Sequence, residues 1–186
     1  LVQNHEAGPG GSDLPPVPIV AGTGYDVGAG AGGGCTVIEV DRSGRRLSEW
    51  VGLSGTVGNC AGGPTPWGSW LTCEETVNGD DVGPDFTGAP NTGLRKHGYV
   101  FEVPTRGRSN AEPIRAAGRF AHEAAAVSRD QRHVYLTEDN FAFASGFYRY
   151  TPPDSPKHHR GLRDGGRLQM LRVQGIDDAD LSVGQP

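Results

Sequence analysis

The amino-acid sequence predicts an all-β protein, and more specifically a partial β-propeller of about three four-stranded blades. The first observation is composition: glycine and proline are abundant, with 30 and 14 residues in a chain of 186. They separate short apolar runs rich in valine, tyrosine, phenylalanine and tryptophan, a pattern typical of many short strands joined by turns. The second observation is an internal repeat of these strands along the chain.

The repeat consists of short strands that recur in the same order. Three strands end in carboxylates: LVQNHE (1–6), WLTCEE (70–75) and VYLTED (134–139). Each is followed by a second strand, CTVIEVD (35–41), YVFEVP (99–104) or GFYRYTP (146–152), and by a third, RLSEWVGLSG (46–55), PIRAAGRF (113–120) or GRLQMLRVQG (166–175). A further strand precedes two of the carboxylate strands, as NCAGG (59–63) and HEAAAV (122–127).

The predicted unit is therefore four antiparallel strands, and the first unit lacks its first strand. Residues 122–139 predict a hairpin with SRDQR as its turn, and Pro64 and Pro66 mark the corresponding turn of the second unit. Four-stranded sheets repeated along a chain are typical of a β-propeller, whose innermost strands line a central channel. A simple β-sandwich also fits the repeat, and the strands alone leave this alternative open.

The propeller register predicts that a thiol and several carboxylates meet at the central axis. Cys60 and Glu123 occupy matching positions on the first strands of their units, and Glu75 and Asp139 match at the ends of the second strands. Glu6 ends the corresponding strand of the first unit. We therefore expect these five side chains to face one point.

Glu75 and Glu123 each have an adjacent polar residue, Glu74 and His122, that should not face the same point. Adjacent residues of a strand point to opposite faces of the sheet. At most one of Glu74 and Glu75 should therefore face the channel. His122 should likewise point away from Glu123 and pack between the sheets.

A cluster of this composition is suited to metal ions. Crowded carboxylates stay ionised together only if cations neutralise them. Carboxylate oxygens suit calcium or magnesium, whereas a thiolate indicates a softer or redox-capable metal such as iron or zinc. Two metal ions close together can hold both the attacking and the leaving oxygen of a phosphoryl transfer. Each residue also has a simpler role open to it: Cys60 as a small buried apolar side chain, and the strand-end carboxylates as solvated groups.

Net charge and hydropathy argue against a nucleic-acid partner and a membrane helix, whereas the cysteine count leaves disulfide pairing open. The net charge of -5 and the absence of a basic stripe argue against a nucleic-acid partner, and no apolar run approaches the roughly 18 residues of a membrane helix. The three cysteines, Cys35, Cys60 and Cys73, cannot all pair within the chain. A Cys60–Cys73 disulfide is geometrically possible, and the spacing neither supports nor excludes it.

Several of these segments together resemble the PhoX family of bacterial alkaline phosphatases. They are NHE (4–6), NCAGGPTPWGSWLTCEE (59–75), HGYVFEV (97–103), GRFAHEAAAV (118–127), VYLTED (134–139) and GFYRYTP (146–152). The resemblance covers most of the chain in the same order. It implies hydrolysis of phosphate monoesters by a six-bladed propeller that is periplasmic or secreted, at a central cluster of ferric (Fe3+) and calcium (Ca2+) ions.

The resemblance also implies roles for individual residues. Cys60, in the NCAGG motif, would bind iron, and Glu75, in the CEE motif, would bind calcium. Glu123, in the HEAA motif, would contact both kinds of ion, and Asp139 of the TED motif would be a further ligand. Glu6 of NHE is a candidate ligand or a structural residue. Cys60 and Glu123 are thus the candidate catalytic residues, and all five are candidate metal ligands.

We therefore expect residues 1–186 to form a single incomplete propeller domain that acts on a small phosphate ester. Blades C-terminal to this chain would complete the ring and supply the remaining ligands and a phosphate-binding arginine. The sequence has neither an initiator methionine nor an export signal, so we expect it to be part of a longer protein.

Three other functions stay open on the sequence alone. One is a calcium-stabilised propeller that acts only as a binding module. Another is a lactonase-like hydrolase that uses calcium alone, in which Cys60 would be a spectator. The third is a purely structural sheet protein.

Overall fold

The computed structural model of the chain describes residues 1–9, 15–85, 87–140, 144–154, 162 and 165–174. Within these ranges, ten strands form three antiparallel sheets, and the helical structure is one short 3-10 helix. No helix in the described ranges has the length and apolar character needed to cross a bilayer. The prediction of an all-β fold is confirmed, whereas the number of blades and the closure of a ring stay predictions.

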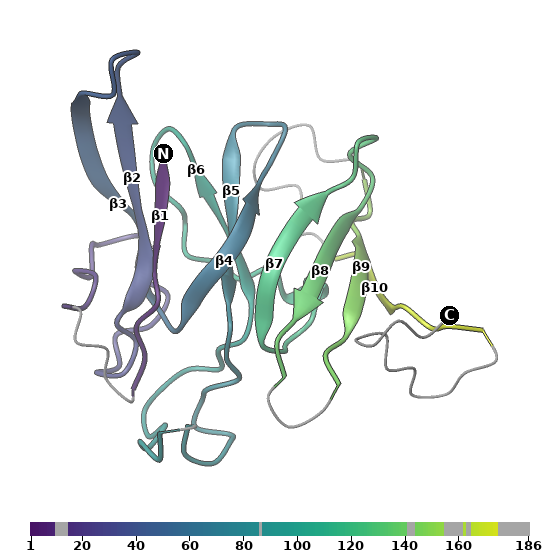
Figure 1. Cartoon of the computed structure of the whole chain (residues 1–186). Coiled ribbons are helices and arrows are strands. Elements are labelled where there is room, and N and C mark those ends of the chain that lie inside the picture. The colour runs from purple at the N-terminus through teal and green to yellow at the C-terminus, as the bar shows by residue number, and fades with distance from the viewer. Residues whose placement is uncertain (10–14, 86, 141–143, 155–161, 163–164, 175–186) are drawn as a thin grey trace.

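The three sheets follow one another along the chain. The first contains β1 (Val2–His5), β2 (Gly33–Val40) and β3 (Arg46–Thr56), and the second contains β4 (Asn59–Pro64), β5 (Ser69–Glu74) and β6 (Val100–Pro104). The third contains β7 (His122–Val127), β8 (Val134–Glu138), β9 (Phe147–Thr151) and β10 (Arg167–Met170). Strands are neighbours in chain order within each sheet, and β4 lies between β1 and β7 (Figure 1).

The second sheet is the middle layer, and its two faces contribute to two separate hydrophobic clusters. Because side chains alternate along a strand, one face can serve each neighbour. Toward the third sheet, Leu71 and Cys73 pack with Val134, Leu136 and Tyr150. Toward the first sheet, Phe101 and Val103 pack with Cys35, Val37 and Leu53. Three successive sheets with these two clusters differ from a β-sandwich, in which two sheets enclose one core.

The predicted turns of two hairpins are confirmed. The SRDQR segment connects β7 to β8, and it is closed by a hydrogen bond from the Ser128 amide to the His133 carbonyl. The turn between β4 and β5 is closed by the Gly68 amide, which donates to the carbonyl of Thr65. These turns fix the register of the strands that carry the candidate site.

The predicted strand over residues 113–120 is wrong. This segment pairs with β6 only through a bridge between Pro113 and Phe101, and it continues as the 3-10 helix η1 (Arg115–Ala117). Its buried residues, Ile114, Ala117 and Phe120, recur every third position, which is the period of a 3-10 turn. Pro113 also lacks the amide that a regular strand would donate.

The inner strands β4 and β7 approach each other very closely at Gly63. A β-carbon added to Gly63 would lie 1.8 Å from the backbone carbonyl oxygen of Ala125. The atoms nearest to this β-carbon are all backbone atoms of Ala125 and Ala126, so no flexible side chain could move to make room for it. Glycine at position 63 is therefore what allows the second and third sheets to meet.

Gly63→Ala is expected to lower the free energy of unfolding by about 1–3 kcal/mol, the usual cost of overfilling a packed interior. Gly83→Ala is the matched control, because a β-carbon there meets no heavy atom within 4 Å. Urea denaturation of both variants measures the difference. Equal stability of the two variants would show that the β4–β7 contact is looser than described.

Candidate metal centre

The five candidate ligands lie at the beginning or just past the end of five strands. Cys60 and Glu123 are the second residues of β4 and β7, and Glu6, Glu75 and Asp139 directly follow β1, β5 and β8. Ligand atoms lie within 4.8 Å of one another in two groups, Glu6–Cys60–Glu75 and Glu75–Glu123–Asp139. Glu75 is shared by both groups. The structure thus brings together all five residues, while their role as metal ligands stays a prediction.

Cys60 and Glu123 both lie in β-bulges. In β4, Asn59 pairs with Glu74 and Gly62 pairs with Thr72, so Cys60 and its neighbour Ala61 oppose a single residue of β5. In β7, the pairing passes from His122–Glu138 to Ala125–Leu136, so Glu123 and Ala124 likewise oppose one residue. Bulges re-aim side chains and are frequent beside active sites. The same irregularity therefore turns the Cys60 and Glu123 side chains toward each other, with Cys60 Sγ 3.9 Å from Glu123 Oε1.

The peptide backbone next to these residues is hydrogen-bonded both between the first two sheets and within the second and third sheets. The Gly58 amide donates to the Ala7 carbonyl at 2.9 Å, and the Glu75 amide donates to the Gly58 carbonyl at 2.9 Å. Gly58 has a φ of 60°, a left-handed conformation that favours glycine. Similarly, the Asp139 amide donates to the Ala121 carbonyl at 3.0 Å. These bonds place the candidate ligands independently of their own side chains.

Crowding makes the site costly to ionise without a cation. Burial, together with hydrogen bonds shared with Asp139 and Glu123, raises the pKa of Glu75 to about 7. Burial and the nearby carboxylates, Glu75 first among them, raise the pKa of Cys60 to about 12. Because a positive charge favours the ionised forms of both groups, a bound cation would reverse these shifts. One thiol and four carboxylates in this space have the donor chemistry of a site for hard and softer cations together.

The sequence matches the model of one protein family, described as Alkaline phosphatase PhoX, over residues 45–184. The chain belongs to the PhoX family of alkaline phosphatases. The matched range includes Cys60, Glu75, Glu123 and Asp139, and Glu6 precedes it. Neither the curated proteins nor the solved structures contain a significant match to the chain.

In this PhoX-family chain, Glu74 and His122 lie where the alternation of strand residues predicts, away from their neighbours Glu75 and Glu123. Glu74 is fully buried and points away from Glu75, toward the first sheet. His122 is also fully buried; its ring stacks on Phe120 with centroids 3.6 Å apart. Burial lowers the pKa of His122 to about 4, so this imidazole is neutral. Both expectations are confirmed: Glu74 and Glu75 do not share one face, and His122 packs away from Glu123.

The three cysteines are free in the described part of the chain. Cys35 and Cys73 are fully buried, whereas Cys60 is partly accessible. The Cys60–Cys73 disulfide that the spacing left open is thus not formed. Cys60 keeps its sulfur available to the cluster.

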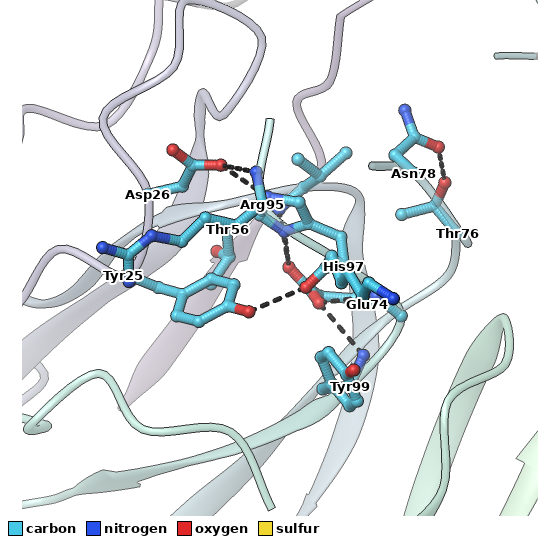
Figure 2. Close-up of polar contacts among 12 residues, drawn as sticks. Tyr25, Asp26, Thr56, Glu74, Thr76, Asn78, Arg95, His97 and Tyr99 are labelled. Carbon is cyan, nitrogen blue, oxygen red and sulfur yellow. Dashed lines mark hydrogen bonds and ion pairs between the residues drawn. The ribbon is translucent and has the colours of Figure 1, made fainter. Parts of the chain in front are cut away.

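Glu74 is held by a buried ionic cluster that the sequence did not reveal (Figure 2). His97 Nδ1 lies 2.6 Å from Glu74 Oε1, and His97 Nε2 lies 3.1 Å from Asp26 Oδ2. The second oxygen of Glu74 accepts the backbone amides of Gly98 at 2.8 Å and Tyr99 at 3.0 Å. The cluster ties the end of β5 to the start of β6 and to the loop that precedes β2.

The imidazolium form of His97 fits this geometry, because both ring nitrogens face carboxylate oxygens that also accept backbone amides, so both nitrogens are placed to donate. Burial alone would lower the pKa of His97, but Glu74 and Asp26 raise it overall. Burial alone would raise the pKa of Asp26, but the amides of Gly28 and Arg95 and the ring of His97 lower it overall. No local pattern marks these residues, since Asp26 and His97 are 71 positions apart.

His97→Gln is expected to lower the free energy of unfolding by about 3 kcal/mol at pH 6, because it leaves two buried carboxylates without their cation. The folded-state pKa of His97 lies above 6.5, so the charge stabilises fully below pH 6.5 and its contribution is lost as pH rises through the raised pKa. The difference between wild type and variant should therefore shrink toward alkaline pH. Urea denaturation across this range measures it.

His133→Gln is the control for this experiment. His133 is only half-buried and contacts the hydroxyl of Thr151 rather than a carboxylate. A stability difference for His97→Gln that stays constant or grows with pH would contradict the imidazolium assignment.

Calcium is expected to stabilise the chain through Glu75. Calcium at 100 times its dissociation constant should raise the free energy of unfolding by about 2.7 kcal/mol, and Glu75→Gln should remove most of this gain. In chelator at pH 8, the variant should be at least as stable as wild type, because the crowded carboxylate is gone. Asp130→Asn, in the exposed β7–β8 turn, is the control that keeps the full calcium effect; an equal calcium effect in Glu75→Gln would exclude Glu75 as a ligand.

Proposed function

We propose that this chain forms part of a metal-dependent phosphatase that hydrolyses phosphate monoesters at the cluster around Glu75. The observation that carries the proposal is the convergence of one thiol and four carboxylates from three sheets. Membership of the PhoX family supports the reaction type.

Charge balance supports more than one cation. A thiolate and four carboxylates repel a phosphate ester unless bound cations at least balance their combined negative charge. A single calcium or ferric ion leaves the cluster negative. We therefore infer that at least two cations occupy it, which agrees with two groups of ligand atoms that share Glu75.

The donor atoms support a division between iron and calcium. Cys60 supplies the sulfur, which favours iron over calcium, and Glu123, with its oxygen 3.9 Å from that sulfur, would share this ion. Glu75, Glu123 and Asp139 form an all-oxygen group of the kind that calcium prefers. Glu6 is the exposed member and would complete the coordination beside Cys60.

The chain's own part in the reaction is to hold positive charge in a fixed place. When bound, the cations would supply the charge that binds phosphate oxygens and stabilises the transition state. Cys60, Glu75, Glu123 and Asp139 would bind them through one thiolate sulfur and carboxylate oxygens. The backbone bonds of Gly58 and Ala121 keep these ligands in position, so little reorganisation is needed when substrate binds.

We also propose that the protein is periplasmic or secreted and that further blades complete a six-bladed ring. The resemblance to exported family members supports the location. Burial of Cys35 and Cys73 would protect both thiols in an oxidising compartment, where exposed thiols tend to be oxidised.

Cys60→Ala is expected to abolish iron binding and phosphatase activity while the fold is kept, because alanine fits the same half-buried position without a ligand atom. Elemental analysis of the purified full-length protein and its turnover of a chromogenic phosphate monoester measure the two effects. Cys73→Ala is the matched control: it removes a thiol from the neighbouring strand that points into the core. Unchanged iron in the Cys60 variant would refute the role given to its sulfur.

The same experiment separates the other functions. A lactonase-like hydrolase that uses calcium alone would keep its ester or lactone activity in Cys60→Ala. A calcium-stabilised binding module would show calcium binding and no turnover in either protein. A purely structural sheet protein would bind neither metal.

A further inference from the structure

Asn4 lies at the contact between the first and second sheets, beside the candidate centre but outside its ligand set. It belongs to β1 and precedes Glu6 by two residues. Its amide nitrogen donates to the carbonyl oxygens of Cys60 at 3.0 Å and Ala61 at 2.7 Å. These two carbonyls belong to the bulge of β4, where the regular strand ladder is interrupted.

The other end of the Asn4 amide is held just as closely. Its oxygen accepts hydrogen bonds from Trp70 Nε1 at 3.1 Å and Thr72 Oγ1 at 3.0 Å, both on β5. The thiol of Cys35 on β2 is a further donor, at 3.2 Å. Because these groups donate and the two bulge carbonyls accept, only one orientation of the amide satisfies the network.

We propose that Asn4 is a positioning residue that sets the direction of the Cys60 sulfur by holding the bulged peptides of Cys60 and Ala61. This inference rests on the proposed function, since it assigns to Asn4 an effect on a metal that Cys60 binds. The same side chain fixes β4 relative to β1, which carries Glu6. It therefore controls the spacing within the Glu6–Cys60–Glu75 group.

The bulge of β7 indicates why β4 needs such a residue. In β7, the Ala124 amide donates to Thr137 Oγ1 of the neighbouring strand at 3.1 Å, so its own sheet supplies a side-chain partner. In β4, the partner for the bulge comes from β1 of a different sheet. The position of the sulfur thus depends on how the first and second sheets meet.

Asn4→Asp tests this role, because it keeps the shape of the side chain and replaces the donor group by a carboxylate oxygen. Titration of the chain with Co2+ reports the metal–sulfur bond through the near-ultraviolet charge-transfer absorbance of a cobalt thiolate. We expect Asn4→Asp to weaken Co2+ binding by about 10- to 100-fold, the usual effect of losing a partner that orients a ligand. The absorbance per bound Co2+ should also fall, which a general loss of stability would not produce.

Gln3→Glu is the matched control, since it makes the same amide-to-carboxylate change at the adjacent, exposed position of β1. Trp70→Phe is the second variant, because it removes one donor to the Asn4 oxygen and keeps an aromatic ring; it should change affinity and absorbance in the same direction by a smaller amount. If Asn4→Asp does not fold, Trp70→Phe decides.

The outcomes separate this inference from the proposed function. The metal role of Cys60 itself would be refuted if wild-type protein showed no charge-transfer band, or if its band persisted in Cys60→Ala. The role of Asn4 alone would be overturned if wild type showed the band and Asn4→Asp left both Co2+ affinity and absorbance unchanged. Where Asn4→Asp does not fold, the same result in Trp70→Phe would overturn it. A loss in Asn4→Asp that Gln3→Glu does not share supports it.

Discussion

The peptide groups on the two sides of Gly58 join the chain segments on which the candidate centre depends. Through them, the segment after β1 is bonded to the start of β4, and the start of β4 is bonded to the end of β5. Glu6, Cys60 and Glu75 all lie within two residues of these bonds. Backbone bonds at irregular segments, and not the carboxylates themselves, therefore set the distances within the cluster. The cluster is thus held together without a cation, at the cost of keeping mutually repelling groups close together.

Glu74 and Glu75 differ in how the negative charge of each carboxylate is compensated. The carboxylate of Glu74 is enclosed and compensated internally by an imidazolium and by backbone amides, so it needs nothing from outside. The carboxylate of Glu75 is left with like-charged neighbours and an elevated pKa, which favours compensation by a bound cation. Two adjacent residues of the same type thus serve the scaffold and the site, respectively, because a strand turns them to opposite faces.

The parts of this arrangement that could be predicted are those governed by strand periodicity. The repeat placed Cys60 and Glu123 at matching positions of successive units, and likewise Glu75 and Asp139. The alternation of strand residues correctly turned Glu74 away from Glu75 and His122 away from Glu123. The repeat failed at residues 113–120, where it predicted a third strand, whereas buried residues at every third position form a 3-10 turn. The His97 cluster and the contacts of Asn4 were not predictable in the same way, because each joins segments that are distant in sequence and carry no shared pattern. The bulges also left no sign beyond the small residues that follow Cys60 and Glu123.

The contacts of Asn4 indicate that the junction between the first and second sheets forms later in folding than the local hairpins. They join β1 to residues 56 to 68 positions further along the chain, and closing such loops carries an entropic cost that local hairpins do not meet. The β4–β5 and β7–β8 hairpins can form early, whereas the junction between the first two sheets has to wait for both. The cations proposed for the cluster would therefore find Glu6, Cys60 and Glu75 side by side only after this junction has formed.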